Sequence, residues 1–298
     1  MVILLSGQLL QAQLEPLSNQ YLLNTLAINP AYAGSREALS ITLLHRTQWT
    51  GFEGAPRTET LTMHAPMRNQ NVGLGLLAMN DRVGISGSKV FLGNFAYRIR
   101  AGNGVMALGI GGGVSVVKNS WNELVASDPD DILLSGYSES YVLPDFSLGL
   151  YYNTPGFFLG FSMPLFLTHS FNSAGGGFDL VNDFSRYNYF FHAGGFLNLS
   201  DRWTVMPSLM LRFKQKTIPQ ADINLYLSYS DRIWLGISYR TSNSIIGTII
   251  YQVNHQLSLA YSYDTGFGRI GRSLGGSHEI MLRYDFRYIV DMINPRYF

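Results

Sequence analysis

Segments of roughly nine to thirteen residues, in which apolar and aromatic residues alternate with small or polar ones, recur along this chain and constrain its fold most strongly. Alternation with a period of two puts the two kinds of residue on opposite faces of a β-strand. In residues 257–264, for example, Leu257, Leu259, Tyr261 and Tyr263 alternate with serine, alanine and aspartate. A tilted strand of about 9–11 residues crosses the apolar part of a membrane.

About fourteen segments follow this pattern, and they start near residues 38, 58, 72, 88, 105, 141, 157, 186, 203, 220, 233, 244, 257 and 278. In a soluble β-sandwich, strands average about five or six residues and their outer face is charged and solvated. Here charged residues make up only 14% of the chain, against roughly 25% in soluble domains. We therefore predict an all-β transmembrane barrel of the outer-membrane type, with about 14 antiparallel strands. A soluble aromatic core is the alternative.

The connectors between these segments alternate in length. Every second one is short and turn-like, at residues 68–71, 101–104, 154–156, 200–202, 231–232 and 254–256. Most of the others are longer and rich in Gly, Ser, Asp and Asn, at residues 48–57, 82–87, 119–140, 169–185 and 267–277. Outer-membrane barrels have short periplasmic turns and longer outer loops. We therefore predict that both termini are periplasmic, with an N-terminal arm (14–37), a barrel (38–288) and a C-terminal tail (289–298).

The N-terminal residues and the composition narrow the possibilities further. Residues 1–13 contain an apolar stretch that ends in small or polar residues, as in the remnant of a secretory signal peptide; a buried first strand or helix is the alternative. No run of about 18 apolar residues occurs, so no transmembrane helix is expected. The net charge of +1 gives no reason to expect a nucleic-acid partner, and the absence of cysteine excludes thiol catalysis.

No residue pattern indicates a catalytic or metal site. The six histidines lie far apart and none has metal-ligand spacing, so no metal and no cofactor are expected. The glycine run 109–115 is followed by more strand rather than by a helix with the lysine of a phosphate loop. Its glycines at 109, 111 and 113 share one strand face, where a plug, loop or partner can approach the wall closely. A barrel enzyme would need a serine and a histidine, such as His64, in contact on one wall, and we predict no enzyme.

Residues 45–66, HRTQWTGFEGAPRTETLTMHAP, form the most distinctive stretch of the chain. It places Trp49, Phe52, Glu53 and Arg57 in a turn between two predicted strands. Exposed Trp and Arg are enriched in binding hot spots, so we predict that these residues bind a partner. A hairpin packed onto the barrel mouth is the alternative.

Five stretches of the sequence resemble the PorP/SprF family. They are SNQYLLNTLAINPAYAGS (18–35), RTQWTGFEGAPRTETLTMHAP (46–66), NVGLGLLAMNDRVG (71–84), GGSHEIMLRYDF (275–286) and PRYF (295–298). The resemblance covers nearly the whole chain. It implies a non-catalytic outer-membrane barrel of Bacteroidota that is associated with type IX secretion and, in some members, with gliding motility. It also implies partners among the periplasmic and lipoprotein components of that system, and secreted adhesins whose C-terminal sorting domain depends on the barrel.

We accordingly predict a lipid-embedded barrel that binds or anchors type IX secretion cargo, such as the C-terminal domain of a surface adhesin. The outer loops and lumen would hold the cargo. The NPAYAGS arm, with Asn29, Pro30 and Tyr32 as binding residues, would face periplasmic components. The main alternative is an outer-membrane channel or porin for a small solute, because a barrel of fourteen strands can leave an open lumen.

Overall fold

The computed structural model describes residues 18–286 except 69, 121–137, 167, 173–176, 182–186, 216 and 268–274. The signal-peptide region 1–13 and the tail 289–298 therefore lie outside the described residues. Within them the strands are β1 (Leu39–Thr47), β2 (Arg57–Pro66), β3 (Val72–Val83), β4 (Ser86–Ala101), β5 (Gly104–Ser120), β6 (Ser138–Asn153), β7 (Phe157–Met163), β8 (Thr168–Asn172), β9 (Gly177–Val181), β10 (Tyr189–Gly195), β11 (Leu197–Asn198), β12 (Trp203–Phe213), β13 (Gln220–Tyr229), β14 (Ile233–Arg240), β15 (Ser244–Gln252), β16 (Leu257–Gly266) and β17 (Ser277–Phe286).

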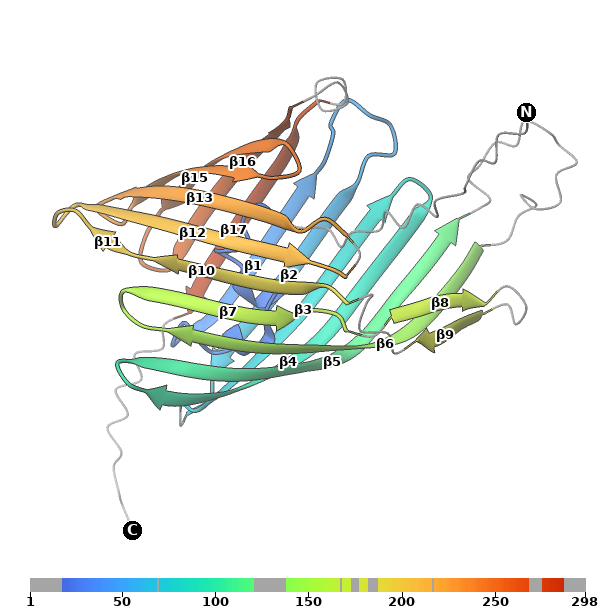
Figure 1. The fold of residues 1–298 in the computed structure, drawn as a ribbon, viewed down its shortest axis with the longest axis horizontal. Helices are drawn as coiled ribbons and strands as arrows, with labels where there is room; N and C mark the ends of the chain where they lie inside the picture. The colour runs from blue at the N-terminus through green and yellow to red at the C-terminus, as the bar shows by residue number, and fades with distance from the viewer. Residues whose placement is uncertain are drawn as a thin grey trace, which may run out of the picture.

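These strands form one closed antiparallel barrel. Consecutive wall strands pair with each other, including β7 with β10 and β10 with β12, and β1 pairs with β17 to close the sheet. The described chain thus supplies fourteen wall strands, with β11 extending β10 and β8–β9 forming a separate hairpin beside the wall (Figure 1). Closure leaves no strand edge for lipid to cover, which is the condition for spanning a membrane with strands.

The structure confirms the predicted all-β barrel of fourteen antiparallel strands. Each wall strand begins within three residues of its predicted start, and the short turns all lie at one rim. Two connectors at the other rim differ from the prediction. The expected connector 82–87 is a tight turn at Gly84 and Ile85, made possible by the positive φ of Gly84 (55°), and the connector 169–185 contains the β8–β9 hairpin.

The two faces of the wall differ in chemistry as the alternation predicts. On β17, Ile280 and Leu282 point outward and are exposed, while Glu279 and Met281 point inward and are fully buried. Leu225 is likewise half-exposed on the outer face. The apolar outer face and polar inner face match a barrel surrounded by lipid. No helix in the described part of the chain is long and apolar enough to cross a membrane.

The lumen contains the N-terminal arm, which we define as residues 18–38. The arm includes two short 3-10 helices, η1 (Thr25–Ala27) and η2 (Pro30–Tyr32), and it lies inside the ring of strands, behind β7 and β10 in Figure 1. Its side chains form small clusters with inward residues of the wall, such as Tyr21 with Phe190 on β10 and Met210 on the neighbouring β12. The core of this protein is therefore the filled lumen.

The first prediction tests the assignment of faces. Leu259→Arg puts a charge on the outer face of β16 among apolar residues, and we expect it to lower the free energy of unfolding by about 2–4 kcal/mol. Thr265→Arg, on the same face of the same strand but at its rim, is the control and should change stability by roughly 0–1 kcal/mol. Urea titration of the barrel in lipid vesicles measures both. Equal losses for the two variants would contradict the assignment.

Candidate functional site

The arm is anchored at its first described residues by the carboxylate of Glu279. This carboxylate accepts hydrogen bonds from Ser18 Oγ (2.5 Å) and from the backbone N–H groups of Asn19 (2.8 Å) and Gln20 (3.0 Å). It also forms an ion pair with Arg46 at 3.0 Å. Glu279 is fully buried and Arg46 is 3% exposed, so each charge depends on the other for compensation.

The middle of the arm packs on inward-facing glycines of the wall. A Cβ atom at Gly109 would overlap the backbone of Ala31, and one at Gly149 would overlap the side-chain oxygen of Asn29. A Cβ at Gly73 would likewise overlap the carbonyl of Ala33. Strand glycines allow this close backbone approach. The prediction that the glycine face of 109–113 admits a plug is therefore confirmed at Gly109, and the plug is the chain's own arm.

Polar contacts fix the arm to strands around the ring. Thr62 Oγ1 on β2 donates to Asn24 Oδ1 at 2.7 Å, Ser162 Oγ on β7 donates to the carbonyl of Ile28 at 2.6 Å, and Asn224 Nδ2 on β13 donates to the Tyr21 hydroxyl at 2.7 Å. Burial raises the pKa of the Tyr21 hydroxyl. At the short-turn rim, Arg36 pairs with Asp285 at 3.0 Å. The arm is thus bound along its whole described length.

Charges on the inner wall are paired with one another. Arg240 binds Asp222 at 2.8 Å, and Arg46 binds Asp264 at 3.1 Å in addition to Glu279. These ion pairs are not predicted from the sequence. Their signal is the presence of arginine and acidic residues at inward positions of several predicted strands, where a charge needs a partner.

The structure places Asn29, Pro30 and Tyr32 inside the barrel rather than on an extension from it. The side chain of Asn29 is fully buried and donates to the carbonyl of Leu150 at 3.0 Å. The Tyr32 ring packs edge-on against the rings of His64 and Tyr151, with the Tyr32 and His64 ring centroids 5.4 Å apart. The sequence pattern of the arm carries no sign of this location, because it depends on glycines far along the chain. Partner binding by these three residues stays a prediction, and it requires the arm to leave the lumen.

The connector between β1 and β2, residues 48–56, forms a loop at the opposite rim from the short turns. Backbone hydrogen bonds tie it to both neighbours: the Thr50 N–H donates to the Gly276 carbonyl (3.1 Å), and the Gly84 N–H donates to the Gly54 carbonyl (2.9 Å). Within the loop, the Gln48 N–H donates to Pro56 at 2.9 Å. We call this segment the rim loop; its backbone is held in one conformation by the barrel.

The rim loop exposes the side chains predicted to bind a partner. Trp49 is 42% exposed and Phe52 is 58% exposed, and Glu53 and Arg57 are also exposed. Trp49 adopts a positive φ of 45°, which is uncommon for a large residue. Backbone hydrogen bonds therefore tie the loop to the barrel, while Trp49 and Phe52 keep a large part of their surface exposed.

The histidines of the described residues form neither a metal-ligand group nor a hydrogen bond with a serine hydroxyl. No group of three or more His, Asp or Glu side chains in this part of the chain is placed to hold a metal ion. Its hydrogen bonds include none between a serine hydroxyl and a histidine ring; His64 Nδ1 accepts from the Gly34 N–H at 3.2 Å.

Comparison with solved structures gives the class of protein. The toluene transporter TbuX of Ralstonia pickettii has a TM-score of 0.52 and 10% identity, over 87% of this chain and 92% of TbuX. The CymD monoaromatic hydrocarbon channel has a TM-score of 0.51 and 14% identity, over 91% and 94% of the two chains. The outer membrane protein Omp33 of Acinetobacter baumannii has a TM-score of 0.50 and 7% identity, over 84% and 98%. The chain has the fold of an outer-membrane β-barrel.

The family model described as "Type IX secretion system membrane protein PorP/SprF" matches residues 10–284. The chain belongs to this PorP/SprF family, as its motifs predict. No curated protein matches the chain.

The second prediction tests whether the arm depends on the inward glycines. Gly109→Leu removes the space that Ala31 occupies, so we expect the arm to be displaced while the wall still closes. Chymotrypsin should then cleave at Tyr21 and Tyr32 in the folded barrel, at least tenfold faster than in the native chain. Gly112→Ala, on the outer face of the same strand, is the control and should leave the arm protected. Protection in both variants would show that the arm does not need this contact.

Proposed function

We propose that this barrel binds type IX secretion cargo at the surface of the outer membrane through the rim loop. The observation that carries the proposal is the combination of a backbone fixed at Thr50 and Gly54 with the exposed side chains of Trp49 and Phe52. A loop that is already ordered loses little conformational entropy when a partner binds. Aromatic side chains presented in this way are the residues that contribute most at protein interfaces.

The proposed partner is the C-terminal sorting domain of a secreted adhesin, in keeping with the family. In this proposal the rim with the long connectors faces outward, both termini are on the periplasmic side, and the short-turn rim meets the periplasmic and lipoprotein components. Glu53 and Arg57 add charges of opposite sign beside the aromatic pair. They would give the contact its orientation, because charge complementarity sets register more than affinity.

The small-solute channel is the second candidate function, and the position of the arm in the lumen bears on it. The solved structures of similar fold include a channel and a transporter, and the similarity to them concerns the fold alone. The arm, the paired charges and the inward aromatic residues occupy the lumen in this conformation. A channel function would therefore require the arm to move.

The third prediction tests the rim loop. The double variant Trp49→Ala/Phe52→Ala should weaken cargo binding by about 2 kcal/mol or more, which is some thirtyfold in affinity, because both side chains are exposed and free to contact a partner. Copurification of the cargo from native membranes measures binding, and heat-modifiable gel mobility measures folding. Ile218→Ala removes a side chain that is 92% exposed in another connector of the same rim, and serves as the control. Normal folding with undiminished cargo would refute the proposal.

The fourth prediction concerns the channel alternative. Deletion of residues 18–30 should raise single-channel conductance in planar bilayers at least severalfold, because it removes the part of the arm that crosses the lumen. The native chain should remain near the closed level under the same salt and voltage. A native barrel that conducts as well as the deletion variant would favour the channel over the anchoring function.

A further inference from the structure

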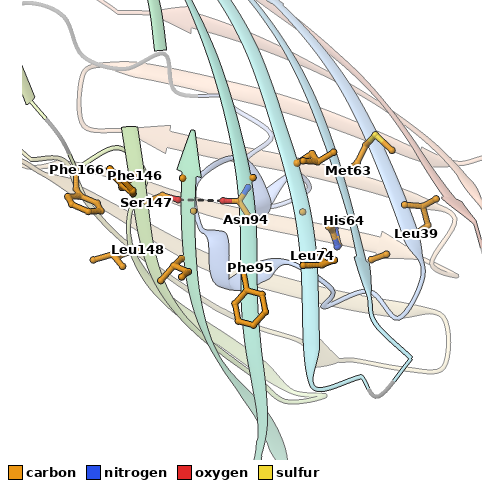
Figure 2. Close-up of a pocket in the computed structure, with 17 residues that line it drawn as sticks. Leu39, Met63, His64, Leu74, Asn94, Phe95, Phe146, Ser147, Leu148 and Phe166 are labelled. Carbon is orange, nitrogen blue, oxygen red and sulfur yellow. Dashed lines mark hydrogen bonds between the residues drawn. The ribbon is translucent and has the colours of Figure 1, made fainter. Parts of the chain in front are cut away.

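The outer wall carries two neighbouring hollows on its lipid-facing side. The first, of about 760 Å³, lies over β1–β6 and is drawn in Figure 2, where Phe95, Leu148 and Phe166 border it. The second, of about 510 Å³, lies over β17 and β1–β4. The two hollows adjoin on β4, where Phe91 lines the second and Gly93 lines the first.

The first hollow exists because two glycines are paired across strands on the outer face. Gly93 on β4 lies directly opposite Gly112 on β5, and the next residues along this row are Leu76 on one side and Phe146 on the other. The outer surface of the wall is therefore recessed here, because two neighbouring strands lack a side chain over a width of about 10 Å. A Cβ at Gly93 would meet only the Gly112 carbonyl oxygen at 3.8 Å. The packing of the wall itself therefore does not require glycine at this position.

The second hollow ends in a cluster of cations toward the rim with the long connectors. Lys89 lines it on β4, and above it Arg57 on β2 and Arg82 on β3 are directly paired across strands. Like charges opposite each other in a sheet are destabilising. Among the described residues none of these three cations forms an ion pair. The nearby Glu59 instead accepts from Asn80 at 3.2 Å and lies 3.7 Å from His45.

We propose that these hollows bind an anionic phospholipid, with its phosphate at Arg82 and Lys89 and an acyl chain over Gly93 and Gly112. Gly93 lies four residues after Lys89 on β4, a distance of about 13 Å along the strand. This length is close to half of the roughly 25 Å apolar band of an outer-membrane barrel, and so to one leaflet. The apolar floor of the hollow is suited to an acyl chain. The arginines, which have no ion-pair partner among the described residues, are suited to a phosphate, because arginine binds phosphate through several hydrogen bonds. This proposal does not depend on cargo binding.

Native mass spectrometry of the full chain, released from detergent with added lipid, tests the site. The probes are dimyristoyl phosphatidylglycerol and dimyristoyl phosphatidylcholine, which share their chains and differ in headgroup charge. We expect the native barrel to retain phosphatidylglycerol preferentially. Arg82→Gln/Lys89→Gln should reduce that preference at least fivefold, whereas Arg202→Gln/Arg232→Gln, which removes two exposed cations at the other rim, should not. An unchanged preference in the first variant, or an equal loss in the second, would overturn the proposal.

The acyl-chain half of the site has its own variant and control. Gly93→Leu/Gly112→Leu fills the first hollow and should lower retention of both lipids at least threefold. Gly247→Leu adds the same side chain at an outward glycine of β15, where an added Cβ would meet no atom within 4 Å, and this variant should retain both lipids. Heat-modifiable mobility confirms folding of each variant. Displacement of phosphatidylglycerol by glycerol 3-phosphate would overturn the lipid site in favour of a site for a free anion. A dimer of the barrel that the double leucine variant abolishes would overturn it in favour of an interface between two copies of the chain.

Discussion

The pairing of β1 with β17 is the interaction on which the rest of this structure depends. Hydrocarbon cannot satisfy a free strand edge, so the wall is viable only when its first and last strands meet. Arg46 and Glu279 face each other directly across this seam, and Glu279 also binds the beginning of the arm. Asp285, further down β17, binds Arg36 where the arm turns into β1. Closure of the wall and attachment of both ends of the arm therefore both depend on β17.

The strands could be predicted from the sequence because each carries its own evidence. A lipid-facing residue such as Leu259 and an inward residue such as Ser262 are distinguished by local alternation, which needs no knowledge of neighbours. Ser228 and Ser262 lie on the inner face of the wall, and both are fully buried. The lumen is packed because the arm fills it, and no local pattern in residues 18–38 reports a contact with glycines at 109 and 149.

The candidate site shows the same division between local and distant information. The aromatic and charged residues of the rim loop stand out in the sequence, and the structure exposes them. The backbone of the rim loop is held by hydrogen bonds to Gly84 and Gly276. These two glycines belong to other hairpins and contact the loop only in the closed barrel. The rim loop stands above the strands whose outer face carries the Arg57–Arg82 pair. A bound protein would therefore sit next to the membrane surface.

The anchoring of the arm has a consequence for biogenesis. The contacts of Ser18, Asn19 and Gln20 with Glu279 span about 260 residues of chain, so they form only after the last strand has been delivered to the first. Contacts of such long sequence separation form late in folding. A nascent or truncated wall without β17 has no carboxylate for the beginning of the arm. Attachment of the beginning of the arm therefore reports that β17 has joined the wall.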